Sequence, residues 1–260
     1  MALDLPLKNT LVFITGASSG IGEATAIKLA ALGANLIITA RRIKQLTKLA
    51  ESIQNTYQTE VLCRQMDVQS LDQVKTVCNN LPDAWQDIDI LVNNAGLARA
   101  TDPIQTGCID NWEVMIDTNI KGLLYVTRMI LPGMIARNKG HIVNIGSIAG
   151  QDCYPQGNIY SATKHAVRAL TKSLRLDLLG TPLRVSEIAP GAVETEFSTV
   201  RWQDTARAQA FYADFTPLTA TDIAETIAFC VTRPAHVNIA EMTVFPTDQA
   251  ACSVINRQKI

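Results

Sequence analysis

Near its start the chain reads Leu11-Val12-Phe13-Ile14-Thr15, followed directly by Gly16-Ala17-Ser18-Ser19-Gly20-Ile21-Gly22. The first run is short, apolar and rich in β-branched and aromatic residues, which is typical of a buried strand. Segment 23–33 consists mostly of helix formers and ends on Gly33, so it predicts a helix with a glycine stop. A glycine turn between a strand and a helix lets the backbone approach a pyrophosphate, whose charge the helix N-terminus stabilises.

The spacing of the glycines is Gly-x-x-x-Gly-x-Gly, which departs from the dinucleotide fingerprint Gly-x-Gly-x-x-Gly. Taken alone, such a turn is equally well explained as a tight connection without a ligand. The strand before it and the helix after it favour a phosphate-binding turn.

A second strand is predicted at 35–40, and it ends where a dinucleotide-binding fold inspects the ribose next to adenine. Ala40 stands at that position and is followed by Arg41 and Arg42. A carboxylate there would suit the ribose hydroxyl of NAD, whereas two guanidinium groups suit the 2′-phosphate of NADP. The alternative is a solvated pair that opens the next helix, but positive charge at a helix N-terminus opposes the helix dipole. The pair therefore favours NADP.

Strand-like and helix-like segments alternate along the rest of the chain. The further strands are predicted at 61–68, 88–93, 141–145, 183–188 and 243–245, and the helices at about 42–56, 70–80, 110–137, 154–179 and 221–232. Such alternation implies parallel βαβ units with right-handed crossovers. We therefore predict an α/β fold, a single Rossmann-type doubly wound parallel sheet of about seven strands with helices on both faces. No linker divides the chain, so we expect one domain over 1–260.

Tyr160 and Lys164 lie four residues apart in a predicted helix, so their side chains leave the same face. An ammonium group near a phenol favours the phenolate and lowers its pKa, so the pair is a candidate for proton transfer. The alternative is an aromatic residue at the edge of the core beside a solvated lysine, and the spacing alone does not decide between them.

A series of motifs along the chain resembles the ordered motif set of the short-chain dehydrogenase/reductase superfamily. The motifs are Thr15-Gly16-Ala17-Ser18-Ser19-Gly20-Ile21-Gly22, Asn93-Asn94-Ala95-Gly96, Asn119, Ser147, Tyr160-x-x-x-Lys164 and Pro190-Gly191. They occur in the family's order across nearly the whole chain. The resemblance implies a Rossmann domain with its active site at the carboxyl ends of the strands, a nicotinamide cofactor, and a homotetramer.

The resemblance also implies roles for individual residues. Tyr160 would be the general acid/base, Lys164 would lower its pKa and hold the nicotinamide ribose, Ser147 would bind the substrate oxygen, and Asn119 would hold a water beside Lys164. These roles have chemical sense, because hydride transfer to a carbonyl leaves an alkoxide that needs a proton and a hydrogen-bond donor. The expected cofactor-binding residues are Gly16, Ser18, Ser19, Gly20, Ile21, Gly22, Arg41, Arg42, Asp67, Val68, Asn94, Ala95, Gly96, Tyr160, Lys164, Pro190, Gly191, Val193 and Thr195.

The C-terminal third carries a narrower resemblance, in segments 191–201, 233–239 and 245–250. These look like the NADP-dependent 3-hydroxy acid dehydrogenases, which act on serine, allo-threonine and 3-hydroxypropionate, and like the related sulfoacetaldehyde reductases. The shared task is to hold a small anion, and Arg201 is the expected cation. Its alternative is a surface arginine on a mobile lid.

The expected substrate residues are Ser147, Gln151, Tyr154, Tyr160 and Arg201. Gln151 stands where many members of the 3-hydroxy acid group carry arginine, which we interpret as a hint of a sulfonate pocket. A substrate lid is expected at about 192–216. A C-terminal tail is expected at about 247–260, either as an arm on a neighbouring subunit or as a loose end.

Composition agrees with a compact cytoplasmic enzyme. The chain has 260 residues, 47% of them hydrophobic, with a net charge of −1 and a pI of about 6.3, so no basic field for nucleic acid or an anionic membrane is present. No apolar stretch approaches the roughly 20 residues that span a bilayer. The six cysteines lack metal-like spacing and are expected as free thiols, and no metal site is expected from the three histidines.

We therefore expect an NADP-dependent oxidoreductase that interconverts a small anionic hydroxy compound and its aldehyde or keto partner. One rival is the same chemistry on a neutral ketone, aldehyde or sugar, with Arg201 serving only to close a lid. The other is a regulatory protein that senses NADPH without turnover. The intact set of Asn119, Ser147, Tyr160 and Lys164 argues against the sensor, because sensing needs no proton relay.

Overall fold

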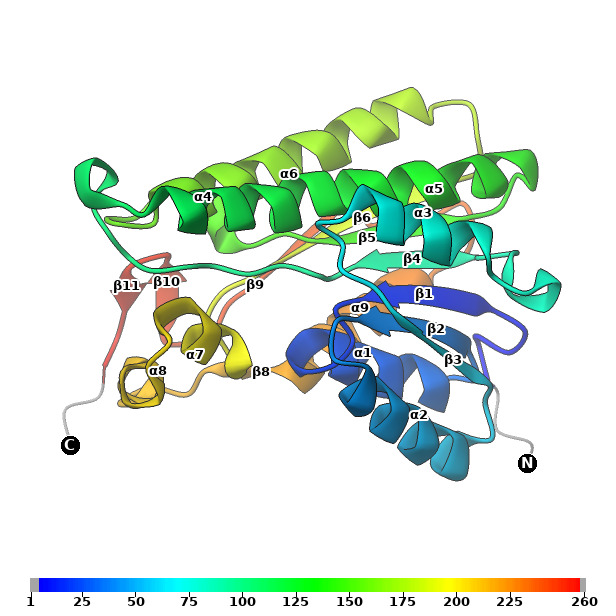
Figure 1. The fold of residues 1–260 in the computed structure, drawn as a ribbon, viewed down its shortest axis with the longest axis horizontal. Coiled ribbons are helices and arrows are strands. Elements are labelled where there is room, and N and C mark those ends of the chain that lie inside the picture. Colours follow the sequence, from blue (N-terminus) through cyan, green and yellow to red (C-terminus); the bar gives the residue numbers. More distant parts are fainter. Residues whose placement is uncertain (1–4, 258–260) are drawn as a thin grey trace.

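The structure is a computed structural model that describes residues 5–257. Its centre is a seven-stranded parallel sheet in the order β3-β2-β1-β4-β5-β6-β9 (Figure 1). The strands are β1 Leu11–Thr15, β2 Asn35–Ala40, β3 Val61–Gln65, β4 Ile90–Asn93, β5 His141–Ile145, β6 Arg184–Pro190 and β9 Glu241–Val244. All seven predicted strands are confirmed, with ends that differ by a few residues.

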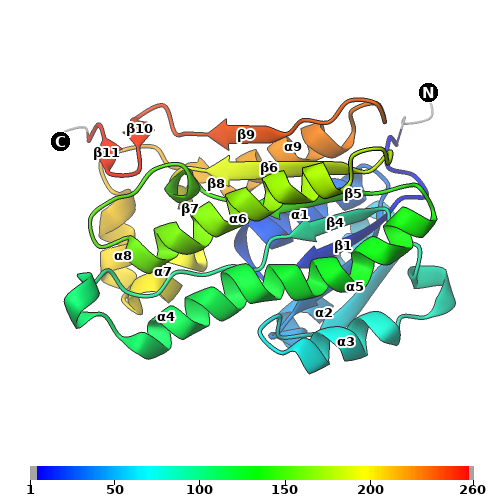
Figure 2. The ribbon, with the colours of Figure 1, turned by 90° about the horizontal axis from the view of Figure 1, so that it is seen from above.

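Helices cover both faces of this sheet (Figures 1 and 2). One face carries α1 Gly20–Ala31, α2 Ile43–Tyr57 and α9 Ala220–Val231, and the other carries α3 Leu71–Asn79, α5 Leu123–Ala136 and α6 Asn158–Asp177. The side chains of β1 alternate between the two cores, with Val12 and Ile14 on one side and Phe13 on the other. A strand buried on both faces needs a continuous apolar run, which explains the composition of 11–15. The predicted doubly wound α/β fold is confirmed.

Two predicted helices have different bounds. Segment 110–137 forms α4 Ile109–Ile116 and α5, separated by a π-helical turn at Asp117–Gly122 that contains Asn119. Segment 154–179 becomes helical only at Asn158, because Pro155 disfavours helical backbone at the residue before it and Gln156 has a positive φ of 64°. Short 3-10 turns lie at Asp83–Trp85, Ile104–Thr106 and Ile148–Gly150.

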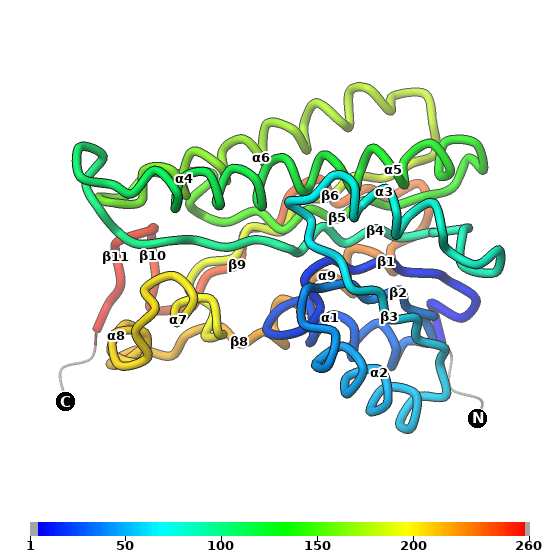
Figure 3. The backbone as a smooth tube through the Cα atoms, in the orientation of Figure 1, coloured from blue at the N-terminus to red at the C-terminus, as the bar shows by residue number. Residues whose placement is uncertain are grey.

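Segments 193–219 and 249–255 lie at the carboxyl ends of the strands of the main sheet (Figure 3). The predicted lid contains β7 Val193–Glu194, which pairs with β8 Leu218–Thr219, then α7 Glu196–Trp202 and α8 Thr205–Tyr212. The predicted tail forms a hairpin of β10 Gln249–Ala251 and β11 Val254–Ile255. Within 5–257 no helix combines the length and apolarity needed to cross a membrane. Residues 1–4 and 258–260 of the predicted domain and tail lie outside the described residues.

Candidate active site

A cavity of about 730 Å³ opens at the carboxyl ends of the strands, on both sides of the β1–β4 pair where the strand order reverses. That position is the usual ligand site of a doubly wound sheet. The glycine turn and the ends of β2 and β4 line one part of it. The start of α6, the α7–α8 segment and the β10–β11 hairpin line the other part.

The glycine turn is shaped for close approach of a ligand to the backbone. Gly16 and Gly20 have φ values of 67° and 59°, and a Cβ on Gly16 would lie 2.9 Å from the Cα of Ala95. The Asn94 amide nitrogen donates to the carbonyl oxygens of Thr15 at 2.9 Å and Gly16 at 3.1 Å, which fixes the turn against β4. Since α1 begins at Gly20, its free N–H groups face the cavity at this turn.

Arg41 and Arg42 both line the cavity beside this turn. Arg42 donates from Nε to Ser18 Oγ at 3.1 Å and from Nη2 to Ser19 Oγ at 2.6 Å, and it pairs with Glu196 of α7 at 3.0 Å. Arg41 lies 4.0 Å from the Asp67 carboxylate. Two guanidinium groups and two serine hydroxyls at the end of β2 are a donor set that fits a phosphate on the adenine ribose.

Most of the predicted cofactor residues line this one cavity. They are Gly16, Ser18, Ser19, Gly20, Ile21, Arg41, Arg42, Asp67, Val68, Asn94, Ala95, Gly96, Tyr160, Lys164, Pro190, Gly191, Val193 and Thr195. Gly22 does not line it. A Cβ on Gly22 would overlap Asn94 and the backbone of Gly16, so this glycine permits close packing behind the turn.

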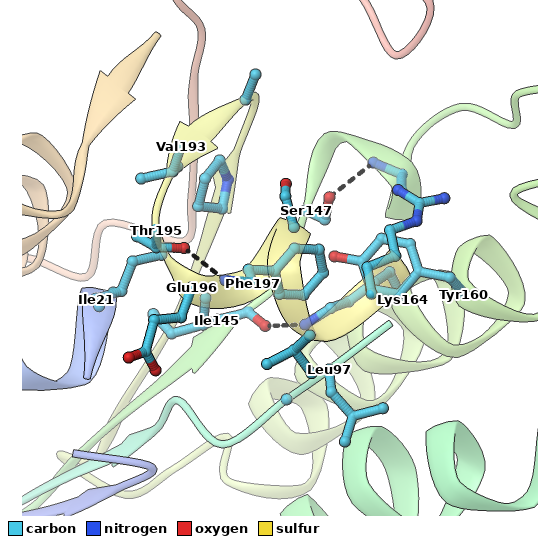
Figure 4. Close-up of a pocket in the computed structure, with 18 of the residues that line it drawn as sticks. Ile21, Leu97, Ile145, Ser147, Tyr160, Lys164, Val193, Thr195, Glu196 and Phe197 are labelled. Atoms are coloured by element: carbon cyan, nitrogen blue, oxygen red, sulfur yellow. Dashed lines mark hydrogen bonds between the residues drawn. The ribbon is translucent and has the colours of Figure 1, made fainter. Parts of the chain in front are cut away.

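Ser147, Tyr160 and Lys164 point into the same part of the cavity (Figure 4). Lys164 is 6% exposed and its Nζ donates to the carbonyl oxygen of Ile145 at 2.8 Å. Burial lowers the pKa of Lys164 to about 8, and the nearby Glu187 carboxylate opposes that change. A lysine with such a pKa exchanges protons easily near neutral pH.

The expected lowering of the Tyr160 pKa by Lys164 stays a prediction. Burial raises the pKa of the Tyr160 phenol well above its ordinary value, and Tyr154 adds to this effect. Ser147, by hydrogen bonding, and Arg201, by its charge, lower the Tyr160 pKa. The Lys164 Nζ lies 6.0 Å from the Tyr160 ring centroid, and its hydrogen bond goes to the Ile145 carbonyl oxygen.

Asn119 lies behind the cavity wall, in the π-helical turn. Its amide nitrogen donates to the Leu97 carbonyl at 2.8 Å and to Thr163 Oγ1 at 3.0 Å, while its Oδ1 accepts from the Leu97 N–H at 2.9 Å. The side chain therefore ties the segment after β4 to α6. Both amide N–H groups of Asn119 already have partners, so a water held by this side chain would donate to the second lone pair of its Oδ1.

Arg201 enters the cavity from α7, as the anion prediction requires. Its Nη2 donates to the Tyr154 hydroxyl at 2.7 Å, and its guanidinium carbon lies 5.4 Å from the Tyr154 ring centroid and 5.8 Å from that of Tyr160. Gln151 is a correction, because it does not line the cavity. It follows the 3-10 turn and is exposed, and its amide donates to Thr243 Oγ1 at 2.7 Å. The structure therefore gives no support to the interpretation of Gln151 as a substrate residue.

The short chain dehydrogenase family model matches residues 10–206 of this chain. The chain belongs to this family. An NADP-dependent 3-hydroxy acid dehydrogenase from Salmonella typhi is 45% identical to it over 242 residues, covering 92% of this chain and 96% of that protein. Sulfoacetaldehyde reductase 2 from Chromohalobacter salexigens is 47% identical over 242 residues, covering 92% and 95%.

Solved structures give the same result. The closed form of serine dehydrogenase complexed with NADP⁺ matches this dehydrogenase with a TM-score of 0.90 and 41% identity, over 96% of this chain and 100% of that one. The resemblance drawn from the motifs is confirmed, as is the assignment to an oxidoreductase family acting on hydroxyl groups.

The sequence did not reveal several residues of the dehydrogenase's cavity. They are Leu97, Thr101, Trp202, Arg207, Phe211, Cys252, Ser253, Ile255 and Arg257. Four of them belong to the C-terminal tail, which packs on its own chain, with the Arg257 guanidinium donating to the carbonyl oxygens of Phe211 and Ala213. Apart from the basic character of Arg207 and Arg257, no local pattern marks them.

Proposed function

We propose that this dehydrogenase uses NADP(H) to interconvert a small anionic hydroxy compound and its aldehyde or keto partner. The candidate substrates are 3-hydroxy acids such as serine or 3-hydroxypropionate, and the pair of isethionate and sulfoacetaldehyde. The observation that carries the proposal is the Arg201 guanidinium inside the cavity, 5.8 Å from the Tyr160 ring centroid. The relatives named for 3-hydroxy acids and for sulfoacetaldehyde support it.

The residues at the glycine turn fit a dinucleotide. The N–H groups at the start of α1 would hold the pyrophosphate, and Arg41, Arg42, Ser18 and Ser19 would hold the 2′-phosphate. Asp67 and Val68 would flank the adenine, and the segment from Pro190 to Thr195 would cover the nicotinamide. Bound NADPH supplies the hydride for reduction of the carbonyl carbon.

The chain's own side chains would manage the proton. As the carbonyl oxygen gains negative charge, Tyr160 donates its phenolic proton to it and Ser147 donates a hydrogen bond to the same oxygen. Lys164 holds the cofactor ribose and returns a proton toward Tyr160, and solvent supplies the proton that balances the reaction. Oxidation of the alcohol runs the same transfers in reverse.

A substrate panel tests the proposal. Hydroxy acids, isethionate and neutral alcohols are each offered with NADP⁺, and the formation of NADPH is followed by absorbance. Turnover that is efficient only with the anions supports the proposal. Efficient turnover of neutral alcohols alone favours the neutral-substrate alternative, in which Arg201 only orders the lid, and NADPH binding without any turnover favours the sensor.

We also propose a homotetramer and a single domain over 1–260, on the family resemblance and the continuous sheet. Sedimentation equilibrium of the full chain tests the first, and a single cooperative unfolding transition tests the second.

A further inference from the structure

The charged residues of the cavity are divided unevenly between its two parts. The charged side chains that line it are Arg41, Arg42, Asp67, Lys164, Glu196, Arg201, Arg207 and Arg257. Both carboxylates pair with arginines of the part that we assign to the cofactor, although Glu196 is the first residue of α7. Asp67 lies 4.0 Å from Arg41, and Glu196 lies 3.0 Å from Arg42.

The reaction part of the cavity is lined by four cations and, within residues 5–257, by no carboxylate. Arg201 and Arg207 flank the Trp202 ring, with their guanidinium carbons 5.4 and 5.1 Å from its centroid. Arg207 donates to Thr101 Oγ1 at 2.9 Å, and Arg257 donates to the Ala213 carbonyl at 2.7 Å. These partners are neutral oxygens, and none of the ion pairs formed by the described residues includes Arg201, Arg207 or Arg257.

This distribution of charge should distinguish between substrates that carry the same anionic group but differ in a second charged group. A 3-hydroxy acid or hydroxysulfonate brings only negative charge, whereas serine and allo-threonine bring an ammonium group on the carbon next to the reacting one. With Arg201 paired to the substrate's own anion, that ammonium would still meet Arg207 and Arg257 and, within residues 5–257, no carboxylate in this part of the cavity. We infer that this dehydrogenase acts on hydroxy acids or hydroxysulfonates that lack an α-ammonium group and discriminates against 3-hydroxy amino acids. The inference rests on the proposed function and narrows its substrate class.

The expected size of the effect follows from Coulomb's law. Two like charges about 6 Å apart in a medium of effective dielectric constant about 20 repel each other enough to change a rate constant about 100-fold. We therefore expect kcat/KM for 3-hydroxypropionate to exceed that for either enantiomer of serine by about 100-fold.

The test compares 3-hydroxypropionate with L-serine and D-serine in steady-state oxidation with NADP⁺. These substrates have the same chain length, carboxylate and reacting alcohol, so the ratio of their kcat/KM values isolates the ammonium. The ratio should narrow at alkaline pH as the amine of serine loses its proton. Titration of the enzyme acts on both substrates and cancels in the ratio.

Two variants sharpen the comparison. Arg207→Gln should lower the ratio several-fold, because it removes one of the repelling charges. Arg233→Gln is the matched control, since Arg233 also stacks on an aromatic ring, 4.3 Å from the Phe229 centroid, but does not line the cavity. If kcat/KM for serine equals that for 3-hydroxypropionate, the inference is overturned and the proposed function still stands. Turnover of neutral alcohols but of neither acid overturns both.

A second inference rests on a different feature, the buried carboxylate of Glu187 on β6. Glu187 is 1% exposed, and neither carboxylate oxygen has a hydrogen-bond partner among the described residues. A Cβ on Gly146, at the end of β5, would overlap this carboxyl group, so the absence of a side chain there makes its room.

The charged groups facing Glu187 come from two elements. The charges of Lys164, Arg168 and Lys172 on α6 act on Glu187, and Glu241 stands opposite it in the register of β6 and β9. Glu241 is already held by Arg168 at 3.1 Å and Lys172 at 3.5 Å, with Arg175 at 4.0 Å. Among the described residues, Glu187 is the carboxylate whose charge acts on Lys164, and the Lys164 ammonium donates to the Ile145 carbonyl.

We propose that Glu187 is a positioning residue whose buried carboxylate keeps the Lys164 ammonium charged. Burial lowers the pKa of Lys164, and Glu187 opposes that change. Burial also raises the pKa of Glu187, to which Glu241 adds, while Arg168, Lys164 and Lys172 act in the opposite direction. The two buried groups therefore stabilise each other's charged forms.

The test is the pH profile of kcat/KM for carbonyl reduction at saturating NADPH. Glu187→Gln keeps the shape of the side chain and removes its charge, so the pH at which activity is lost on the alkaline side should fall by about one unit. Glu187→Asp restores a carboxylate and should bring that pH back toward the wild-type value. Asp89→Asn is the matched control, because Asp89 is a buried carboxylate just before β4, at the amino end of the sheet, held by Lys139 at 2.9 Å. An unchanged profile in folded Glu187→Gln, or the same displacement in Asp89→Asn, overturns the proposal.

Discussion

Replacing Lys164 by Met should separate the cost of a buried charge from its catalytic use. Lys164 is 6% exposed, and burial lowers its pKa from 10.5 to about 8. The unfolded chain therefore binds this proton more tightly than the folded chain does. We expect the variant to lose turnover and to lose the pH dependence of stability that this group confers.

The magnitude follows from the two pKa values. A change from 10.5 to about 8 corresponds to about 3 kcal/mol. Between these values the unfolded state holds more protons, so the free energy of unfolding of the wild type rises with pH, and the full penalty applies below pH 8. From pH 7 to pH 10 the expected gain relative to Lys164→Met is about 2.5 kcal/mol. The variant also leaves the Ile145 carbonyl without its donor, which costs about 1–3 kcal/mol at every pH.

The assay is urea unfolding of both proteins without cofactor at pH 7, 8, 9 and 10. As pH rises, the unfolding free energy of the wild type should increase relative to that of Lys164→Met. Lys172→Met is the control on the same helix, since its side chain is 48% exposed and pairs with Glu241 at 3.5 Å. A difference that stays constant from pH 7 to pH 10 would refute the assignment of a buried, proton-releasing lysine.

Tyr160→Phe should lower turnover by about two to four decades with little change in the dissociation constant of NADPH, because it removes only the proton donor; wild-type turnover would contradict the role. Neutral residues at Arg41 and Arg42 should raise KM for NADP strongly and leave KM for NAD nearly unchanged, and equal use of both cofactors by the wild type would defeat this. Arg201→Ala should lower kcat/KM for acidic substrates by about one to three decades and spare neutral aldehydes, whereas a uniform loss would mean that it only orders the lid. Gln151→Arg should leave the ratio of 3-hydroxy acid to isethionate efficiency unchanged, since Gln151 lies outside the cavity.

The main sheet could be predicted because its signals are local. Each buried strand is a short apolar run, and Gly16 and Gly20 mark a turn whose φ values only glycine adopts easily. The interruption of the helix at 110–137 could not be predicted in this way. Its π-helical turn contains Asn119, whose partners Leu97 and Thr163 lie 22 and 44 residues away in the sequence.

The same limit applies to the site. Helical spacing predicts that Tyr160 and Lys164 share one face of a helix. It predicts neither the distance between the Lys164 ammonium and the phenol nor how deeply the two side chains are buried. The tail residues and Arg207 reach the cavity only through tertiary packing, on Phe211 and Trp202. Gln151 shows the opposite error, because a residue close in sequence to Ser147 points its side chain toward β9.

The acidity of Tyr160 links the substrate end of the cavity to the proton transfer. In this structure the phenol keeps its proton, because burial raises its pKa more than Ser147 and Arg201 lower it. An anion bound to Arg201 would cancel much of the positive charge that favours the phenolate, and so would hold the proton on Tyr160 more firmly. The protonated phenol is the form that carbonyl reduction requires. Oxidation of the same substrate needs the phenolate, so in that direction the positive charge of bound NADP⁺ would have to offset the effect of burial on the Tyr160 pKa.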